Sequence, residues 1–497
     1  MNRILTRIYF VVAFVCALAL LSAGLCGPGE TLAAKPAKTE KEAKNAPGTE
    51  TWAKPNAVMD GTRMADMSKF DPANWVNPEG EDTIRIAVVW THSGPASFVG
   101  DQAWLTVAWA VYDINQRGGI MVDGKKKKIA LYKVDTQSKP DVAKKACERA
   151  VLQDKVHVLL GSSGSNIVKV MNEVANKYKV ISVNMASSSE ELQDVTNFNR
   201  YSFMTCDSTS QIGRSAAYYY GQIRKKEKKF YILCQDYSYG KDMAEGFKRG
   251  LKEYYPEAQL VGEDYHKLFL TDYAPYLTKI KASGAEVIFT GDWIPDSSNL
   301  IKQSRQMGLT IPLVGNYLDD ENTLAQVGIE GSKGLVTVKH FEKAGPLPNA
   351  GTIKFYKAWN EQWKSVWKAP FNSVLFKYPW SHLGNWTQHV YWTLSVIERA
   401  KSTDPEKIIR VFEGDTFQMV NGRLIQMRAC DHRAIQGFRV AEFVPPAEQK
   451  QNMSIPPYYW LDNASMPGPA WDIPAEKVLP WMDQKLDRCK GKNDWGK

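Results

Sequence analysis

Motifs of the kind that identify enzymes and metal proteins are missing from this sequence of 497 residues. Its 7 histidines are scattered, and no HExxH, GxGxxG or P-loop motif occurs. Its 7 cysteines include no CxxC pair and no Cys/His spacing typical of zinc sites. The Gly-Ser-Ser-Gly-Ser segment at 161–165 has the composition of a nucleophile elbow but not the spacing of its glycines. The sequence therefore indicates no enzyme, no cofactor and no metal site.

Signs of nucleic-acid binding are also missing. The formal net charge is +9, and much of the positive excess lies in two basic runs, 125–128 and 224–229. Neither run is interleaved with aromatic residues, and no nucleic-acid-binding module is visible. Because both runs lie beside turn signals, they are typical of solvated loops or helix ends. We expect no DNA or RNA partner.

Long hydrophobic stretches are absent after residue 34. Arg3 and Arg7 precede an apolar stretch over 8–21, and small residues follow at 31–34. This stretch is shorter than the roughly 20 residues of a membrane span. The pattern is typical of a signal peptide over 1–34 that is cleaved on export, which predicts a periplasmic protein.

The cysteines bear on anchoring and on disulfides. Cys26 would suit a lipid-anchored form, but the bulky Leu25 before it disfavours lipoprotein processing, so we favour simple cleavage. Removal of the signal peptide leaves an odd number of cysteines: Cys147, Cys206, Cys234, Cys430 and Cys489. In an oxidising compartment we expect one or two disulfides and at least one thiol that is free or pairs between chains.

Strands and helices alternate through most of the chain. Residues 35–81 are rich in Lys, Ala, Pro and Glu without apolar periodicity, which predicts a flexible arm. Order begins at 84–90, a nearly continuous apolar run that suits a buried parallel strand, and a helix over 101–116 follows. Comparable strands are expected at 129–134, 156–160, 180–184, 230–234 and 287–290. This alternation predicts an α/β protein with two doubly wound parallel-sheet lobes.

Two later segments depart from this alternation. Trp359, Trp363 and Trp367 recur every four residues in a helical segment, so they share one face and indicate core packing. Beyond Val444, prolines alternate with tyrosines and tryptophans. Prolines at these intervals exclude a helix or a central strand. The many aromatic residues, however, favour packing against the body over exposure to solvent. We expect residues 445–497 to wrap over the surface of the body.

Two serine-rich loops follow neighbouring strands of the first predicted lobe. One is the 161–165 segment, and the other is the Met-Ala-Ser-Ser-Ser-Glu segment at 185–190. Each leads into a predicted helix and offers hydroxyls and backbone N–H groups at its N-terminus, which together favour an anion such as a carboxylate. Serine and glycine also cap helices without binding anything. The repetition in successive units favours a binding site.

Aromatic residues with nearby carboxylates follow strands of the second predicted lobe. The three segments are Asp-Tyr-Ser-Tyr-Gly at 236–240, Gly-Asp-Trp-Ile-Pro-Asp at 291–296 and Gly-Asn-Tyr-Leu-Asp-Asp at 315–320. Ring faces and negative charge together suit a cation. An anion pocket opposite an aromatic-acidic pocket predicts a zwitterion or a polar amide as the guest.

The order of these motifs resembles the leucine/isoleucine/valine class of type I periplasmic binding proteins over about 84–444. The resemblance includes Ser-Gly-Pro at 93–95, Asp-Ile-Asn at 113–115, Gly-Gly-Ile at 118–120, both serine loops and the 236–240 segment. It implies a fold of two lobes joined by a multi-strand hinge. Lobe 1 would span 82–206 and 338–429, and lobe 2 would span 207–337 and 430–444.

The resemblance also implies the ligand-binding residues. Ser163, Ser165, Ala186 and Ser187 would hold a ligand carboxylate in the first lobe, and Tyr239 and Trp293 would close over the ligand from the second. Two positions depart from the family's pattern. Tyr317 stands where amino-acid binders place a glutamate on the ammonium, and Val99, with Phe98 beside it, replaces an aromatic wall. A differently shaped amino acid, a urea-like amide or an aromatic acid therefore remain open.

The function implied is that of an extracytoplasmic solute-binding receptor. It would capture a small polar ligand, an amino acid or a related amide or carboxylate, between the lobes and deliver it to the membrane permease of an ABC transporter. The same lobes also serve as sensors. Since no DNA-binding module and no later transmembrane segment is visible, a ligand-sensing domain would need a separate signalling partner.

Overall fold

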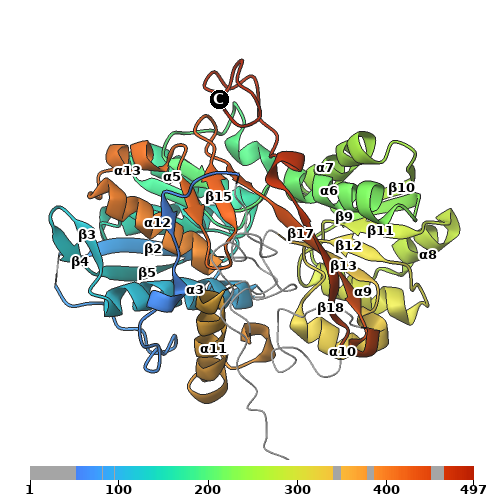
Figure 1. Cartoon of the computed structure of the whole chain (residues 1–497), viewed down its shortest axis with the longest axis horizontal. Coiled ribbons are helices and arrows are strands. Elements are labelled where there is room, and N and C mark those ends of the chain that lie inside the picture. Colours follow the sequence, from blue (N-terminus) through green and yellow to red (C-terminus); the bar gives the residue numbers. More distant parts are fainter. Residues whose placement is uncertain (1–51, 81, 95, 340–348, 378–385, 449–463) are drawn as a thin grey trace, which may run out of the picture. The chain divides into compact units, whose positions relative to one another are not determined.

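Two β-sheets, each covered by helices, form the body of the chain; one is parallel as predicted, and the other is parallel except for two strands at one edge (Figure 1). The computed structural model describes residues 52–80, 82–94, 96–339, 349–377, 386–448 and 464–497. The predicted signal peptide, residues 35–51 and 81 of the predicted arm, and 449–463 of the tail lie outside the described residues. Among the residues it describes, no helix is long and apolar enough to cross a membrane.

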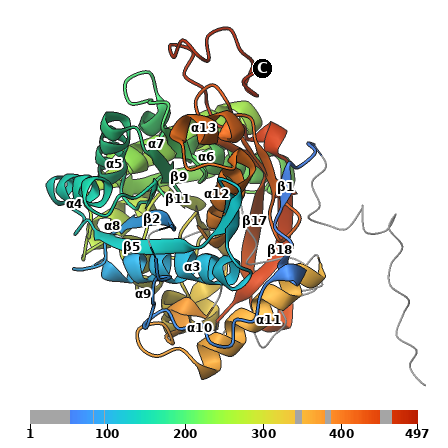
Figure 2. The same ribbon diagram turned by 90° about the vertical axis from the view of Figure 1, so that its left-hand side faces the viewer.

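The first lobe is built on a five-stranded parallel sheet with the order β5-β2-β6-β7-β8. Its strands are β2 (Ile84–Trp90), β5 (Ile129–Asp135), β6 (Val158–Gly161), β7 (Ile181–Asn184) and β8 (Ser202–Met204). The covering helices are α3 (Ser97–Gln116), α4 (Pro140–Leu152), α5 (Ser165–Tyr178) and α12 (Trp386–Ala400). Helices α4 and α5 pack against each other, and α3 packs against α12 (Figure 2). The continuous apolar run of β2 is buried because helices cover both faces of its sheet.

The second lobe is built on a seven-stranded sheet with the order β10-β9-β11-β12-β13-β17-β18. The first five strands are parallel: β9 (Lys229–Gln235), β10 (Gln259–His266), β11 (Val287–Thr290), β12 (Leu313–Gly315) and β13 (Leu335–Lys339). The last two, β17 (Phe438–Val444) and β18 (Met466–Ile473), are antiparallel. Its helices are α6 (Thr209–Tyr218), α7 (Ser238–Tyr254), α8 (Ala274–Ser283), α9 (Asp296–Gln306) and α10 (Glu321–Ser332).

A smaller four-stranded sheet has the order β1-β14-β15-β16. It combines β1 (Ala57–Val58) with β14 (Thr416–Gln418), β15 (Leu424–Met427) and β16 (Ala434–Gln436). Helices α11 (Ala350–Ser365) and α13 (Pro405–Phe412) lie between β1 and β14 in the chain. A single bridge links Met204, at the end of β8, to Arg433, so the late chain returns to the first sheet before it enters β17.

The described part of the predicted arm is packed, which corrects the expectation of a flexible segment. Ala57 pairs with Phe417 of β14. Phe70 is fully buried, and its ring centroid lies 5.3 Å from that of Trp109. Nε1 of Trp104 donates to the carbonyl of Pro72 at 2.8 Å. The apolar residues of this segment are few and irregularly spaced. Those that are buried pack individually against the body, so the sequence shows no periodic pattern.

The two basic runs take different structures. Residues 125–127 form β4 (Lys125–Lys127), which pairs with β3 (Ile120–Val122) as a hairpin and not as the predicted loop or helix end. Asp123 and Gly124 connect the strands with positive φ angles of 52° and 77°, as a two-residue hairpin turn requires. The second run contains a helix end, since a π-helix over Tyr219–Arg224 stops there. The guanidinium of Arg224 then pairs with Glu227 and Glu442 at 2.9 and 2.6 Å.

The C-terminal segment joins the body through several contacts. Strand β18 pairs with β17 at the edge of the seven-stranded sheet, a position that tolerates proline. A disulfide connects Cys430 to Cys489, while Cys147, Cys206 and Cys234 are free and buried. The buried Arg428 guanidinium donates to the carbonyls of Pro480 and Trp481 at 2.8 and 2.9 Å.

The tryptophan stripe is mostly core. The ring of Trp359 lies 4.8 Å from that of Trp109 and 5.1 Å from that of Trp367, and all three are buried. Trp363 is half-buried and donates from Nε1 to the carbonyl of Ser373 at 2.8 Å. Helix α11 ends at Ser365, so Trp367 reaches the same core from beyond the helix.

Candidate functional site

A pocket of about 50 Å³ lies where loops of the two lobes meet. Its first-lobe side comes from the start of α3, the two serine loops and the start of α12, and its second-lobe side from loops after β9, β11 and β12. The lining residues are Val99, Ser163, Gly164, Ser165, Ala186, Ser187, Ser188, Tyr237, Tyr239, Trp293, Tyr317 and Trp386. Loops at the carboxyl ends of parallel strands form it, which is the usual place for a ligand in open α/β sheets.

The N-terminus of α5 opens into the first-lobe side of this pocket. Its N-cap is Gly164, which adopts a φ of 88° and provides no side-chain cap for the first amides of the helix. The hydroxyl of Ser165 is bound to that of Ser189 at 2.7 Å, while Ser163 is half-buried at the pocket. Uncapped amides, the helix dipole and a nearby hydroxyl together favour a negatively charged group.

Asn184, the last residue of β7, fixes the second serine loop. Its Oδ1 accepts from the amides of Ala186 and Ser187 at 3.2 and 2.9 Å, and its Nδ2 donates to the Ser187 carbonyl at 2.7 Å. The Ser187 hydroxyl donates to the Ser162 carbonyl at 2.7 Å. Ser187 therefore connects the two serine loops, and its hydroxyl proton is already engaged inside the protein.

Aromatic rings form the second-lobe side. Nε1 of Trp293 donates to the hydroxyl of Tyr237 at 2.9 Å, and the rings of Tyr237 and Tyr239 lie 5.9 Å apart. The hydroxyl of Tyr239 is buried and has no hydrogen-bond partner among the described residues. Burial raises the pKa of the Tyr239 and Tyr317 hydroxyls well above their usual value, so both stay neutral donors. The wall thus offers ring faces and a free hydroxyl.

The carboxylates that were predicted to accompany these rings do not line the pocket. Asp236 pairs with Lys241 at 2.9 Å, Asp292 with His266 at 2.9 Å, and Asp319 with Lys339 at 3.2 Å. Oδ2 of Asp296 accepts from Nε2 of Gln235 at 2.7 Å, and Oδ2 of Asp320 accepts from the amide of Thr323 at 2.8 Å. Each carboxylate has a partner within its own lobe, which draws it away from the ring faces.

Seven of the eight predicted ligand residues come together at the pocket: Ser163, Ser165, Ala186, Ser187, Tyr239, Trp293 and Tyr317. Phe98 does not line it, and the next residue, Val99, does. The reason is that α3 begins at Ser97, before the predicted start, so successive side chains already turn about the helix axis. Sequence reasoning did not single out Trp386, which lines the pocket from the start of α12. The ring of Trp386 lies 4.6 Å from that of Trp90.

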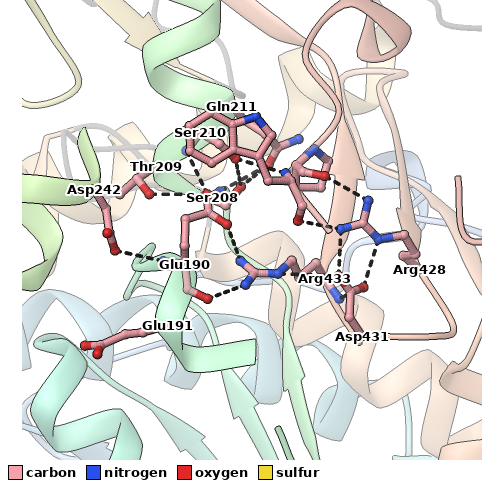
Figure 3. A network of polar contacts seen from close by, with 12 residues as sticks. Glu190, Glu191, Ser208, Thr209, Ser210, Gln211, Asp242, Arg428, Asp431 and Arg433 are labelled. Atoms are coloured by element: carbon pink, nitrogen blue, oxygen red, sulfur yellow. Dashed lines mark hydrogen bonds and ion pairs between the residues drawn. The ribbon is translucent and has the colours of Figure 1, made fainter. Parts of the chain in front are cut away.

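A network of charged residues adjoins the second serine loop (Figure 3). Oε2 of Glu190 pairs with Arg433 at 2.8 Å, and Oε1 of Glu190 accepts from the amide of Ser210 at 2.8 Å. The guanidinium of Arg428 binds both oxygens of Asp431 at 2.9 and 2.6 Å. This network joins the loop after β7 to the start of α6 and to the segment that follows β15.

Within the described ranges, one group could provide three metal ligands: Cys430, Asp431 and Cys489. The two sulfur atoms of this group form the disulfide. Their thiolates are therefore not available to a metal ion in this structure.

Comparison with known proteins identifies the family of the chain. A model of the periplasmic binding protein family matches residues 83–450. An amino acid binding protein from Pseudomonas aeruginosa is 29% identical over 260 residues, which cover 51% of this chain and 66% of that protein. The chain thus spans about two thirds of the length of this relative.

Solved structures share the fold. The leucine-, isoleucine-, valine-, threonine- and alanine-binding protein from Brucella ovis, in a closed conformation, has a TM-score of 0.65 at 20% identity, with 81% of this chain and 98% of that chain covered. An ABC transporter solute-binding protein from Rhodopseudomonas palustris, in complex with 3,4-dihydroxybenzoic acid, has a TM-score of 0.64 at 19% identity, covering 79% and 98%. The chain belongs to the periplasmic binding protein family, and its two-lobed fold is that of the type I members.

Proposed function

We propose that this protein is a periplasmic receptor that captures a small organic carboxylate between its lobes and delivers it to the permease of an ABC transporter. The observation that carries the proposal is the composition of the pocket. An uncapped helix N-terminus and serines lie on one side, and four aromatic rings lie on the other. The first side suits a carboxylate, and the second suits a flat or apolar body.

The paired aspartates narrow the ligand class. A plain amino acid needs a partner for its ammonium, but the five aspartates of the aromatic loops are already engaged elsewhere in the protein. A cation could still contact the ring faces. The arrangement favours an acid with an aromatic or branched apolar body. The named relatives, an amino acid binding protein and a receptor holding a dihydroxybenzoic acid, are consistent with that range.

Ligand capture would follow from lobe closure. The cavity of about 50 Å³ is smaller than the roughly 300–1,000 Å³ typical of ligand pockets, so we expect the lobes to separate when a ligand enters. Closure around the ligand would remove water from the carboxylate and strengthen its hydrogen bonds to the α5 amides. The closed form would then be the one that the permease recognises, as in other hinge-closing receptors.

The remaining assignments belong to the same proposal. We propose lobe boundaries at 82–206 with 338–429 and at 207–337 with 430–444, export by a signal peptide over 1–34, and no chemical turnover of the ligand. The strands of 84–204 lie in one sheet and those from β9 to β13 in the other, which supports a division near residue 206. Strand β13 ends at Lys339, two residues after the proposed second boundary.

The test is a binding screen by calorimetry with benzoate, 4-hydroxybenzoate, leucine, phenylalanine and the neutral isostere benzamide. We expect at least one carboxylate to bind and benzamide not to bind. In the Trp293→Ala and Tyr239→Ala variants the affinity for the best probe should fall by about 1–3 kcal/mol. Trp363→Ala is the matched control, since Trp363 is a half-buried indole outside the pocket. Binding of no acid, or normal binding by both pocket variants, would refute the proposal.

A further inference from the structure

A second cluster of ionisable residues is buried directly behind the aromatic wall. His266 ends β10, Asp292 directly precedes Trp293, and Asp296 begins α9 three residues after it. Each of the three is at most 1% exposed. The two aspartates therefore flank the turn that carries the Trp293 ring, and the histidine packs against them from another strand.

Both ring nitrogens of His266 face hydrogen-bond acceptors. Nδ1 lies 2.9 Å from the carbonyl oxygen of Lys267, and Nε2 lies 2.9 Å from Oδ2 of Asp292. A backbone carbonyl only accepts, and so does an ionised carboxylate. A neutral imidazole has one N–H and would leave one of these contacts unmade. The geometry is therefore that of a doubly protonated, positively charged ring.

The surroundings of His266 stabilise this charge. Burial alone would lower the pKa of His266, but the hydrogen bond and charge of Asp292, the Lys267 carbonyl and the charge of Asp296 together raise it. The Tyr273 hydroxyl lies 3.3 Å from Nε2 and donates to Asp292 Oδ2 at 3.1 Å. The rings of Tyr273 and Tyr276 pack edge-on against the imidazole at 5.0 and 6.0 Å.

The second aspartate, Asp296, is also stabilised in its ionised form by the positive charge of His266. Burial raises the pKa of Asp296, while hydrogen bonds from Gln235 Nε2 at 2.7 Å and from the Phe269 amide at 2.9 Å lower it. Two buried carboxylates thus share one imidazolium. If His266 loses its proton, a carboxylate beside the Trp293 turn is left without a counter-charge, which is costly in a buried site.

We propose that His266 is a positioning residue for the ligand site, whose positive charge holds the Asp292–Asp296 turn and keeps the Trp293 ring in its binding geometry. This inference rests on the proposed function of the pocket. Ligand affinity is then highest while the imidazole is charged and falls as rising pH removes its proton. His266 touches no ligand itself, since it is absent from the described pocket lining.

The charge state can be measured without any ligand. Nitrogen-detected NMR of the mature full-length protein, with His266→Gln to assign the signal, reports which ring nitrogens carry protons. We expect both to be protonated at pH 7 and one proton to be lost at higher pH. A single neutral tautomer at pH 7 would overturn the proposal, whatever the ligand is.

The effect on binding is tested with benzoate and leucine as probes, by calorimetry between pH 6 and 8.5. We expect wild-type affinity to fall about tenfold across this range, which corresponds to one pKa unit of coupling. His266→Gln and Asp292→Asn should bind more weakly at pH 6 and show a flat profile. His157→Gln is the control, because His157 lies in the first lobe, where its Nδ1 accepts from the Arg85 amide at 3.0 Å.

The outcomes separate this inference from the proposed function. A parallel fall of affinity in wild type and His266→Gln would overturn the role of His266 while leaving the receptor function intact. If no acid of the binding screen binds, the carboxylate proposal fails, and the NMR measurement still decides the charge of His266.

Discussion

The backbone nitrogen of Glu190 lies 3.0 Å from Oδ2 of Asp242, in a hydrogen bond that joins the loop after β7 to helix α7 (Figure 3). One residue belongs to the first lobe and the other to the second, and Ser189 before Glu190 is bound to the pocket residue Ser165. Burial, and next the carboxylate of Glu190, raise the pKa of Asp242 to about 7. The contact between the lobes therefore contains a carboxyl that titrates near neutral pH.

We predict that Asp242→Asn removes a pH dependence of stability. The native pKa of about 7 is above the ordinary value of 3.8, so the carboxyl stabilises the native state at low pH. That contribution is lost as pH rises through about 7. From pH 5 to pH 8 the wild type should lose about 2–3 kcal/mol relative to the variant, measured by urea unfolding. Asp236→Asn is the control, because it removes an exposed carboxylate, paired with Lys241, that takes no part in the contact with Glu190. A difference that stays constant with pH for Asp242→Asn would contradict the prediction.

Tyr239→Phe should separate binding from stability. The Tyr239 hydroxyl is buried without a hydrogen-bond partner among the described residues, so its removal costs no internal bond. We expect an unchanged or slightly higher free energy of unfolding and an affinity for the best carboxylate probe that is about 1 kcal/mol weaker. Tyr237→Phe is the comparison, because it loses the bond from Trp293 Nε1 and should also lose stability. Equal binding by Tyr239→Phe and wild type would show that the hydroxyl does not meet the ligand.

Phe70→Ala should destabilise the whole body, although Phe70 precedes the region matched by the family model. Its ring is fully buried and contacts those of Trp109 and Trp367 at 5.3 and 5.9 Å. Truncation of a buried phenylalanine costs about 3–5 kcal/mol, which chemical denaturation would detect. Val76→Ala, six residues later and 82% exposed, should change stability by less than about 0.5 kcal/mol. A loss below 1 kcal/mol for Phe70→Ala would mean that the arm packs only weakly.

Removal of the disulfide should weaken the attachment of the C-terminal segment. Cys430 and Cys489 are separated by 59 residues, and closing a loop of that length stabilises a protein by about 4 kcal/mol on the chain-entropy estimate. The Cys430→Ser, Cys489→Ser double variant should lose about that much, and a reductant should lower the stability of the wild type but not of the variant. Equal sensitivity of both proteins to the reductant would argue against the pairing.

The sequence predicted the parts of the fold that depend on local pattern. The apolar run of β2 is a buried parallel strand, because helices cover both faces of its sheet. Both serine loops lie at the pocket, because parallel strands end at the same edge of a sheet. Their ligand roles stay predictions until the binding screen is done.

What the sequence did not predict depends on partners that are distant in the chain. Asp292 looked available for a ligand cation, but its partner His266 lies 26 residues earlier on another strand. Asp319 is likewise neutralised by Lys339 from β13. The burial of Phe70 could not be predicted, because a single buried ring produces no periodic pattern in the sequence. Its contact Trp367 also lies 297 residues later along the chain. The residue types indicated which chemical groups are present. Whether each carboxylate faces a ligand or pairs inside the protein depends on tertiary contacts, which the sequence does not show.

The order in which the sheets are completed has a consequence for folding during synthesis. Strand β1 can pair only after β14 has been synthesised, because Ala57 pairs with Phe417. Strand β13 likewise lacks its antiparallel neighbour until residues 438–444 have been synthesised. Strand β18 follows later still. The five-stranded sheet of the first lobe is complete once residue 204 has been made, whereas the small sheet and the seven-stranded sheet lack strands until the last part of the chain is present, so an incomplete chain would expose unpaired strand edges.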